Sequence, residues 1–123
     1  MVKCPKCGVE YKNIMGLAYH VRNYHVRTCF HCGITFNPTS LQKHLRLLLI
    51  KCIWSDNGKI KYRITKEEKE KLFLACYLQG GWKLRRLLRV HYPKAYENIY
   101  KALANKTDLS YLVAPTQNVF YEP

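Results

Sequence analysis

Residues 4–25 read CPKCGVEYKNIMGLAYHVRNYH, and the spacing of their cysteines and histidines decides the fold of this part of the chain. Cys4 and Cys7 are separated by two residues, which fits a tight turn, while His20 and His25 can face the same side of one short helix. Four such side chains can surround a tetrahedral Zn²⁺ ion. Because so short a segment cannot bury enough apolar surface to fold alone, we expect the metal to supply the missing stability.

Two apolar residues between the ligand pairs, Tyr11 and Leu17, complete a framework that resembles the Cys2His2 zinc-finger family. The resemblance implies a β-hairpin and a helix, with the aromatic ring and the leucine packed beneath the zinc. In DNA-binding members, residues near the helix start read bases in the major groove. Among the corresponding residues, Asn13 is typical of base recognition, whereas Met15 and Tyr19 equally suit contact with a protein.

A second unit repeats the framework with one irregularity. Cys29 and Cys32 form the first ligand pair, Phe36 takes the aromatic position, and Leu41 and His44 keep their family spacing. A leucine stands where the family has its second histidine.

Three candidates remain for the fourth ligand of this second site. Cys52 lies eight residues beyond His44, about 12 Å along a continuous helix, so it can bind only if the helix ends near Leu48 and the chain turns back. We predict a site that includes Cys52; water or Cys76 are the alternatives. His31, inside the turn, is expected to contact solvent or phosphate rather than the metal.

The helix of the second unit is expected to start at Asn37-Pro38, with asparagine as the N-cap. Its base-reading positions are Asn37, Thr39, Ser40 and Lys43, all of which can hydrogen-bond to bases or phosphates. The linker between the two units is only three residues long, which predicts that they pack as a fixed pair.

The C-terminal half predicts three helices. Alternating basic and apolar residues around a Ser-Asp-Asn-Gly turn predict a β-hairpin over residues 51–64, with a loop as the alternative. A capping box at Thr65 begins a helix to about Gln79, and further helices are expected over residues 82–90 and 93–104.

This helix order resembles helix-turn-helix DNA-binding domains, with a generic three-helix bundle as the alternative. The resemblance implies contacts to phosphates from the second helix and to bases from the third. The tail, residues 111–121, is expected to form a wing-like hairpin or an arm that docks on a partner. The residues to which the resemblance assigns contacts are Arg85, Arg86 and Arg89 for phosphates, and Lys94, Asn98 and Lys101 for bases.

The composition favours a polyanionic partner. The chain of 123 residues carries 21 Lys and Arg against 8 Asp and Glu, a formal charge of +13, and both halves are basic. No apolar run is long enough to span a membrane. Cysteines in metal-type pairs predict a reducing, intracellular location.

The sequence therefore predicts a small α+β protein with two zinc-stabilised ββα fingers, residues 1–26 and 27–52, followed by a winged helix-turn-helix-like domain, residues 53–123. The predicted function is zinc-dependent binding of double-stranded DNA in transcription regulation, with an RNA- or protein-binding adaptor as the alternative. No acidic metal cluster or activated nucleophile indicates an enzyme. The composition, rich in Tyr, Ile and Lys, is similar to that of small regulators of archaeal viruses.

Overall fold

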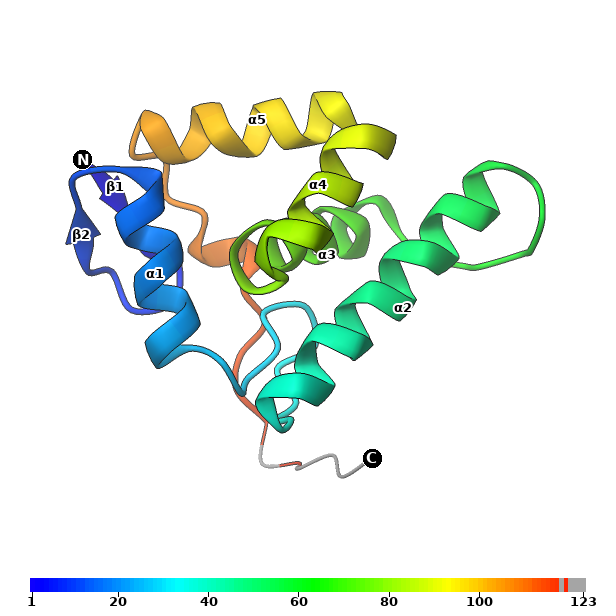
Figure 1. Cartoon of the computed structure of the whole chain (residues 1–123), viewed down its shortest axis with the longest axis horizontal. Helices are drawn as coiled ribbons and strands as arrows, with labels where there is room; N and C mark the ends of the chain where they lie inside the picture. The colour runs from blue at the N-terminus through cyan, green and yellow to red at the C-terminus, as the bar shows by residue number, and fades with distance from the viewer. Residues whose placement is uncertain (118, 120–123) are drawn as a thin grey trace.

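Helix α3 (Lys66–Gln79) forms the centre of the fold, and four other helices pack around it (Figure 1). The structure is a computed structural model and describes residues 1–117 and 119. Every side chain from Leu72 to Gln79 is buried, so the C-terminal half of α3 has no solvent face. Apolar residues of both zinc-type units belong to the same core as those of α3. The surrounding helices are α1 (Ile14–Tyr24), α2 (Pro38–Asp56), α4 (Gly81–His91) and α5 (Pro93–Ala104).

The first unit has its elements in the predicted order. Strands β1 (Val2–Lys3) and β2 (Glu10–Tyr11) pair antiparallel, and α1 follows them. Asn13 is the N-cap of α1, because its Oδ1 accepts a hydrogen bond from the Gly16 amide at 2.9 Å. Leu17 and the next turn of α1 point into the core.

The second unit contains no regular hairpin. A single antiparallel bridge between Thr28 and Thr35 stands in its place, and α2 starts at Pro38 as predicted. The expected helix end near Leu48 is wrong, because α2 continues to Asp56. The β-hairpin predicted over residues 51–64 is wrong for the same reason.

The end of α2 explains this error. Gly58 has a φ of +77°, its amide donates to the Ser55 carbonyl at 3.1 Å, and the Lys59 amide donates to the Trp54 carbonyl at 2.9 Å. These two bonds form a Schellman motif with glycine at C′. Asn57-Gly58 therefore ends a helix instead of turning a hairpin.

The three helices of the C-terminal half begin and end within a residue or two of their predicted bounds. Thr65 Oγ1 accepts the Glu68 amide at 3.1 Å, which caps α3 as predicted. The junction between α3 and α4 needs glycine at position 80. A Cβ there would lie 2.6 Å from the Cys76 carbonyl oxygen and 2.7 Å from Leu84 Cβ.

The segment after the short 3₁₀ helix η1 (Ser110–Leu112) runs back along the turn of the second unit (Figure 1). The Ala114 amide donates to the Phe30 carbonyl, and the Gln117 amide donates to the Gly33 carbonyl, both at 2.8 Å. The tail thus packs on its own chain. No wing-like hairpin occurs among the described residues, and most of the predicted second strand, residues 120 and 121, lies outside them.

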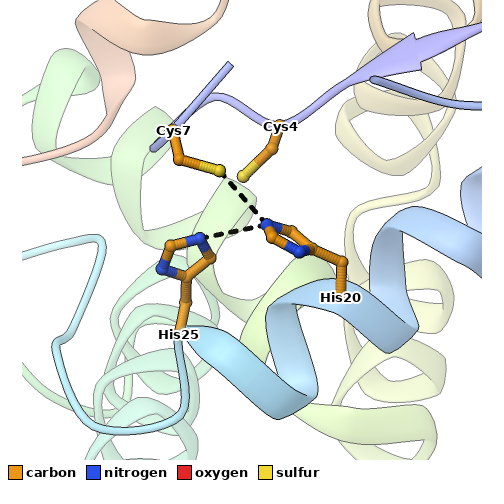
Figure 2. A group of neighbouring side chains, drawn as sticks. All are labelled: Cys4, Cys7, His20 and His25. Carbon is orange, nitrogen blue, oxygen red and sulfur yellow. Dashed lines mark hydrogen bonds between the residues drawn. The ribbon is translucent and has the colours of Figure 1, made fainter. Parts of the chain in front are cut away.

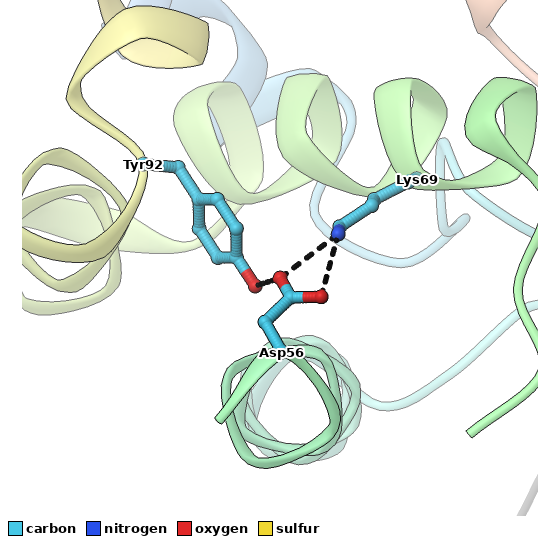
Figure 3. Close-up of polar contacts among 3 residues, drawn as sticks. All are labelled: Asp56, Lys69 and Tyr92. Atoms are coloured by element: carbon cyan, nitrogen blue, oxygen red, sulfur yellow. Dashed lines mark hydrogen bonds and ion pairs between the residues drawn. The ribbon is translucent and has the colours of Figure 1, made fainter. Parts of the chain in front are cut away.

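A polar cluster joins the end of α2 to α3 and to the α4–α5 junction (Figure 3). Asp56 accepts hydrogen bonds from Lys69 Nζ at 3.1 and 2.9 Å and from the Tyr92 hydroxyl. The hydrogen bonds from Tyr92 and then Lys69 lower the pKa of Asp56. Burial, followed by the bond to Asp56, raises the pKa of Tyr92.

Candidate metal centres and cationic surface

The first ligand group is assembled from the β-hairpin and α1 (Figure 2). Cys4 and Cys7 lie on the turn after β1, His20 on α1, and His25 just past its end. His20 Nε2 lies 3.2 Å from Cys7 Sγ and 3.2 Å from His25 Nε2, and the four ligand atoms lie within 4.8 Å of one another.

These separations fit a tetrahedral zinc ion. Bonds of about 2.3 Å to sulfur and about 2.1 Å to nitrogen place a sulfur and a nitrogen ligand about 3.6 Å apart, and two nitrogens about 3.4 Å apart. The four atoms are therefore arranged closely enough to hold the ion with only small adjustments.

Neighbouring groups prepare His20 and His25 for metal binding. His20 Nδ1 lies 3.0 Å from the Tyr11 hydroxyl oxygen; with Nε2 bound to the metal, Nδ1 would carry the proton and donate to this oxygen, which would fix the ring. Burial lowers the pKa of His20. Burial, then the charges of His20 and Lys6, lowers that of His25. The neutral imidazole that a metal requires is thus favoured.

The second ligand group consists of Cys29, His31, Cys32 and His44, whose ligand atoms also lie within 4.8 Å of one another. Cys32 Sγ is 3.6 Å from His44 Nε2, which is the separation expected for two ligands of one zinc ion. The hydrogen bond between the two thiols lowers the pKa of Cys32 and raises that of Cys29.

The structure brings His31, and not Cys52, to this group. Because α2 is continuous, Cys52 lies two helical turns beyond His44, and its side chain is buried in the apolar core. Cys76 is also buried there, with its Sγ 4.0 Å from the Leu45 carbonyl oxygen. His31 Nδ1 is the only buried side-chain nitrogen or oxygen among the described residues that lacks a hydrogen-bond partner.

His31 is therefore the fourth candidate ligand, against the expectation that it would face solvent. The signal in the sequence is the Cys-x-His-Cys turn, in which a histidine inside the turn was expected to be poorly placed for the same ion. The donor set of two sulfurs and two nitrogens matches that of the first group.

Gln79 of α3 holds the linker between the two groups. Its Oε1 accepts the Phe30 amide at 2.9 Å, and its Nε2 donates to the carbonyls of His25 at 2.8 Å and Thr28 at 2.7 Å. The side chain is buried. Gln79 thereby fixes the two zinc-type units relative to each other and to the central helix. No pattern in the sequence predicted this role.

Most predicted nucleic-acid contacts are exposed, but two are restricted and one is excluded. Ser40 is buried and cannot reach a partner, because it lies on the core side of α2. Arg85 is half-buried, and its Nε donates to the Tyr77 carbonyl at 3.0 Å. Lys101 is exposed but pairs with Glu97 at 3.0 Å. The other predicted contacts are exposed, although Asn13 Oδ1 is already engaged as the N-cap of α1: Asn13, Asn37, Thr39, Lys43, Arg86, Arg89, Lys94 and Asn98.

The acidic residues are unevenly placed. None occurs between Glu10 and Asp56, a stretch that includes α1, the second ligand group and nearly all of α2. None occurs between Glu70 and Glu97, a stretch that includes α4. Several acids stand instead near the end of α2 and the start of α3. The charged residues of the zinc-type units and of α4 are therefore almost all basic.

Residues 28–47 match the family model described as zinc finger, C2H2 type. No curated protein and no solved structure matches the chain. Among the described residues, no helix has both the length and the apolar character needed to cross a membrane. The matched segment includes Cys29, Cys32 and His44, and proteins with such fingers bind nucleic acids or other proteins. Zinc is therefore the cofactor of this chain, and the match places a C2H2-type zinc finger within residues 28–47.

Proposed function

We propose that this protein is a zinc-dependent binder of double-stranded DNA that acts as a transcription regulator and has no enzymatic activity. The observation that carries the proposal is the absence of any acidic residue between Glu10 and Asp56. Within this stretch, both zinc-type units expose polar or basic residues near their helix N-termini: Asn13, Asn37, Thr39 and Lys43. A duplex offers one phosphate charge per about 1.7 Å, so such a surface attracts it.

The residues of α2 have distinct roles in this proposal. Asn37 can form a bidentate pair with an adenine edge, and it is free to do so because its side chain makes no cap bond. Lys43 neutralises a phosphate, and Thr39 hydrogen-bonds to a phosphate or a base. Zinc fixes the start of α2 by holding His44 against the cysteine turn.

Gln79 adds rigidity to the pair of units. It immobilises the linker by three hydrogen bonds, so the N-termini of α1 and α2 keep one mutual orientation. A pair held in this way meets DNA as a single preformed surface, and no ordering of a flexible linker opposes binding.

Salt-dependent binding to a labelled duplex tests the proposal. We expect affinity to fall steeply between about 50 and 200 mM salt, and zinc removal with a chelator to abolish binding. Lys43→Ala should reduce the slope of log affinity against log salt by about 1. The matched control is Lys59→Ala, which removes an exposed lysine next to the acidic end of α2. Salt-independent binding, or equal effects of both variants, would contradict the proposal.

A second candidate function, an RNA- or protein-binding adaptor, is favoured by the outer face of α1. Met15 is 83% exposed and Tyr19 is 69% exposed, and they lie one helical turn apart. Neither is a typical base reader. Competition binding separates the two functions. Equal affinity for every duplex sequence, or a preference for structured RNA, favours the adaptor, whereas preference for particular duplexes favours the regulator.

A further inference from the structure

Helix α4 borders a hollow of about 420 Å³ whose lining includes no residue of the zinc-type units. Three arginines, two aromatic rings and one aliphatic side chain line it. Trp82 is 62% exposed and Val90 is 65% exposed, so large apolar surfaces face solvent between positive charges. The lining residues are Trp82, Arg85, Arg86, Arg89, Val90 and Tyr96.

The hollow is lined by basic and not by acidic groups. Among the described residues no acidic side chain lines it, and none occurs in the sequence between Glu70 and Glu97. Arg86 and Arg89 are exposed, and Arg85 is oriented by its bond to the Tyr77 carbonyl. These guanidinium groups present several N–H donors to a negatively charged ligand.

One of the two aromatic rings, Tyr96, is packed against its neighbours, and the other, Trp82, is open. Tyr96 packs on Tyr77, with ring centroids 5.1 Å apart, and the Arg85 guanidinium lies 5.5 Å from the Tyr77 ring centroid. Lys83 Nζ lies 5.8 Å from the centroid of the Trp82 ring. The indole of Trp82 therefore stands at the edge of a hollow lined by arginines while most of its surface stays open to solvent.

We propose that this hollow binds single-stranded DNA, with a base stacked on Trp82 and the adjacent phosphates held by Arg86 and Arg89. Exposed aromatic rings between cations are the arrangement by which proteins hold unpaired strands, since every base has a π face and every nucleotide carries a phosphate. Paired bases in a duplex present no free face for such stacking. The distance along α4 from Trp82 to Arg89 is about 10 Å, which spans two or three nucleotides.

This inference goes beyond the proposed duplex binding, because it uses other residues and another form of DNA. The resemblance to helix-turn-helix domains assigned only phosphate contacts to the three arginines of α4. A helix that only crosses the backbone of a duplex gives no reason for Trp82 and Val90 to be exposed between these arginines. They are explained by a ligand with an apolar face.

Tryptophan fluorescence tests the stacking directly, because the chain has only two tryptophans. In a Trp54→Phe variant, Trp82 is the only tryptophan, and a thymidine oligomer of about ten nucleotides should quench the emission excited selectively from tryptophan. In the matched Trp82→Phe variant, the emission of Trp54 at the far end of α2 should not change. Binding of the oligomer without quenching of Trp82, or no binding at all, would overturn the inference.

Affinity measurements test which groups hold the strand. Trp82→Ala should weaken binding of the oligomer roughly tenfold and leave duplex affinity unchanged. Arg86→Ala combined with Arg89→Ala should lower the salt slope by about 1.4, whereas Lys59→Ala combined with Lys61→Ala, which removes the same charge elsewhere, should not. A loss of oligomer affinity no greater in the arginine variant than in the lysine variant would overturn the inference.

The same series separates this inference from the proposed function. If Lys43→Ala weakens binding to a duplex while the oligomer still quenches Trp82 as before, the variant has altered only the duplex surface. If a duplex quenches Trp82 as strongly as the single-stranded oligomer does, this result contradicts a site for unpaired bases. A uridine oligomer bound at least tenfold more tightly than the thymidine oligomer would overturn the assignment to DNA.

Discussion

Replacing Gln79 by leucine is expected to lower the free energy of unfolding by about 3 kcal/mol. The side chain makes three hydrogen bonds of 2.7 to 2.9 Å, and each contributes about 1 kcal/mol net. Leucine has similar bulk but no polar atoms, so the Phe30 amide and the carbonyls of His25 and Thr28 would lose their partner. For a domain of this size, the loss corresponds to a fall in melting temperature of about 12 °C.

Urea denaturation followed by far-ultraviolet circular dichroism measures the effect, with the zinc concentration held constant because bound metal adds to apparent stability. Gln79→Glu should be at least as harmful, since a carboxylate cannot donate to the two carbonyls. Gln42→Leu, at an exposed glutamine of α2, is the control and should change stability by less than about 0.5 kcal/mol. A Gln79→Leu protein as stable as this control would refute the role assigned to the linker contacts.

Three further perturbations test the second ligand group, the polar cluster and the tail. Native mass spectrometry should find the zinc count reduced from two to one in His31→Ala and unchanged in Cys52→Ala. Tyr92→Phe should cost about 1 kcal/mol near neutral pH. The folded protein raises the pKa of Tyr92, so the stability that its hydroxyl contributes is complete below about pH 10 and is lost as the pH rises toward the folded-state pKa. The denaturation curves of the Tyr92→Phe variant and the original protein should therefore converge at that high pH. Gly33→Ala should destabilise more than Gly58→Ala in urea: both positions have positive φ, but only at Gly33 would the new Cβ lie 2.0 Å from a tail carbonyl oxygen.

The first ligand group could be predicted because its information is local. Two ligand pairs, Tyr11 and Leu17 lie within 22 residues, and their spacing is dictated by one turn and one helix. The structure adds a contact that spacing alone does not give, the hydrogen bond between the Tyr11 hydroxyl and His20. The helices after Thr65 were predictable for the same reason, since a capping residue, two glycines and a proline mark their ends.

The length of α2 could not be predicted because it depends on packing against α3. Leu45, Leu49 and Ile53 are buried on successive turns, and contact with the central helix extends α2 well past the ligand His44. The same Asn-Gly pair can turn a hairpin or end a helix, and only the tertiary contacts decide between them. The error about Cys52 followed directly from the expected early helix end.

The sequence of α3 contains enough information to predict that its C-terminal half is completely buried. From Leu72 to Leu78 the helix has no charged residue, a run that is apolar on every side and therefore typical of a helix enclosed by others. The environment of Gln79 depends on segments some fifty residues away and had no local signal.

The tail that crosses the second zinc-type unit has a consequence for the order of assembly during synthesis. The first metal group closes within one short loop, so it can capture zinc as soon as that loop leaves the ribosome. The edge of the second unit is completed only by residues such as Gln117, whose side chain donates to the Cys32 carbonyl 85 positions earlier. Closing so long a loop is entropically costly and slow. A newly made chain therefore has a complete first unit and an unpaired edge on the second unit until the segment around Gln117 has been synthesised.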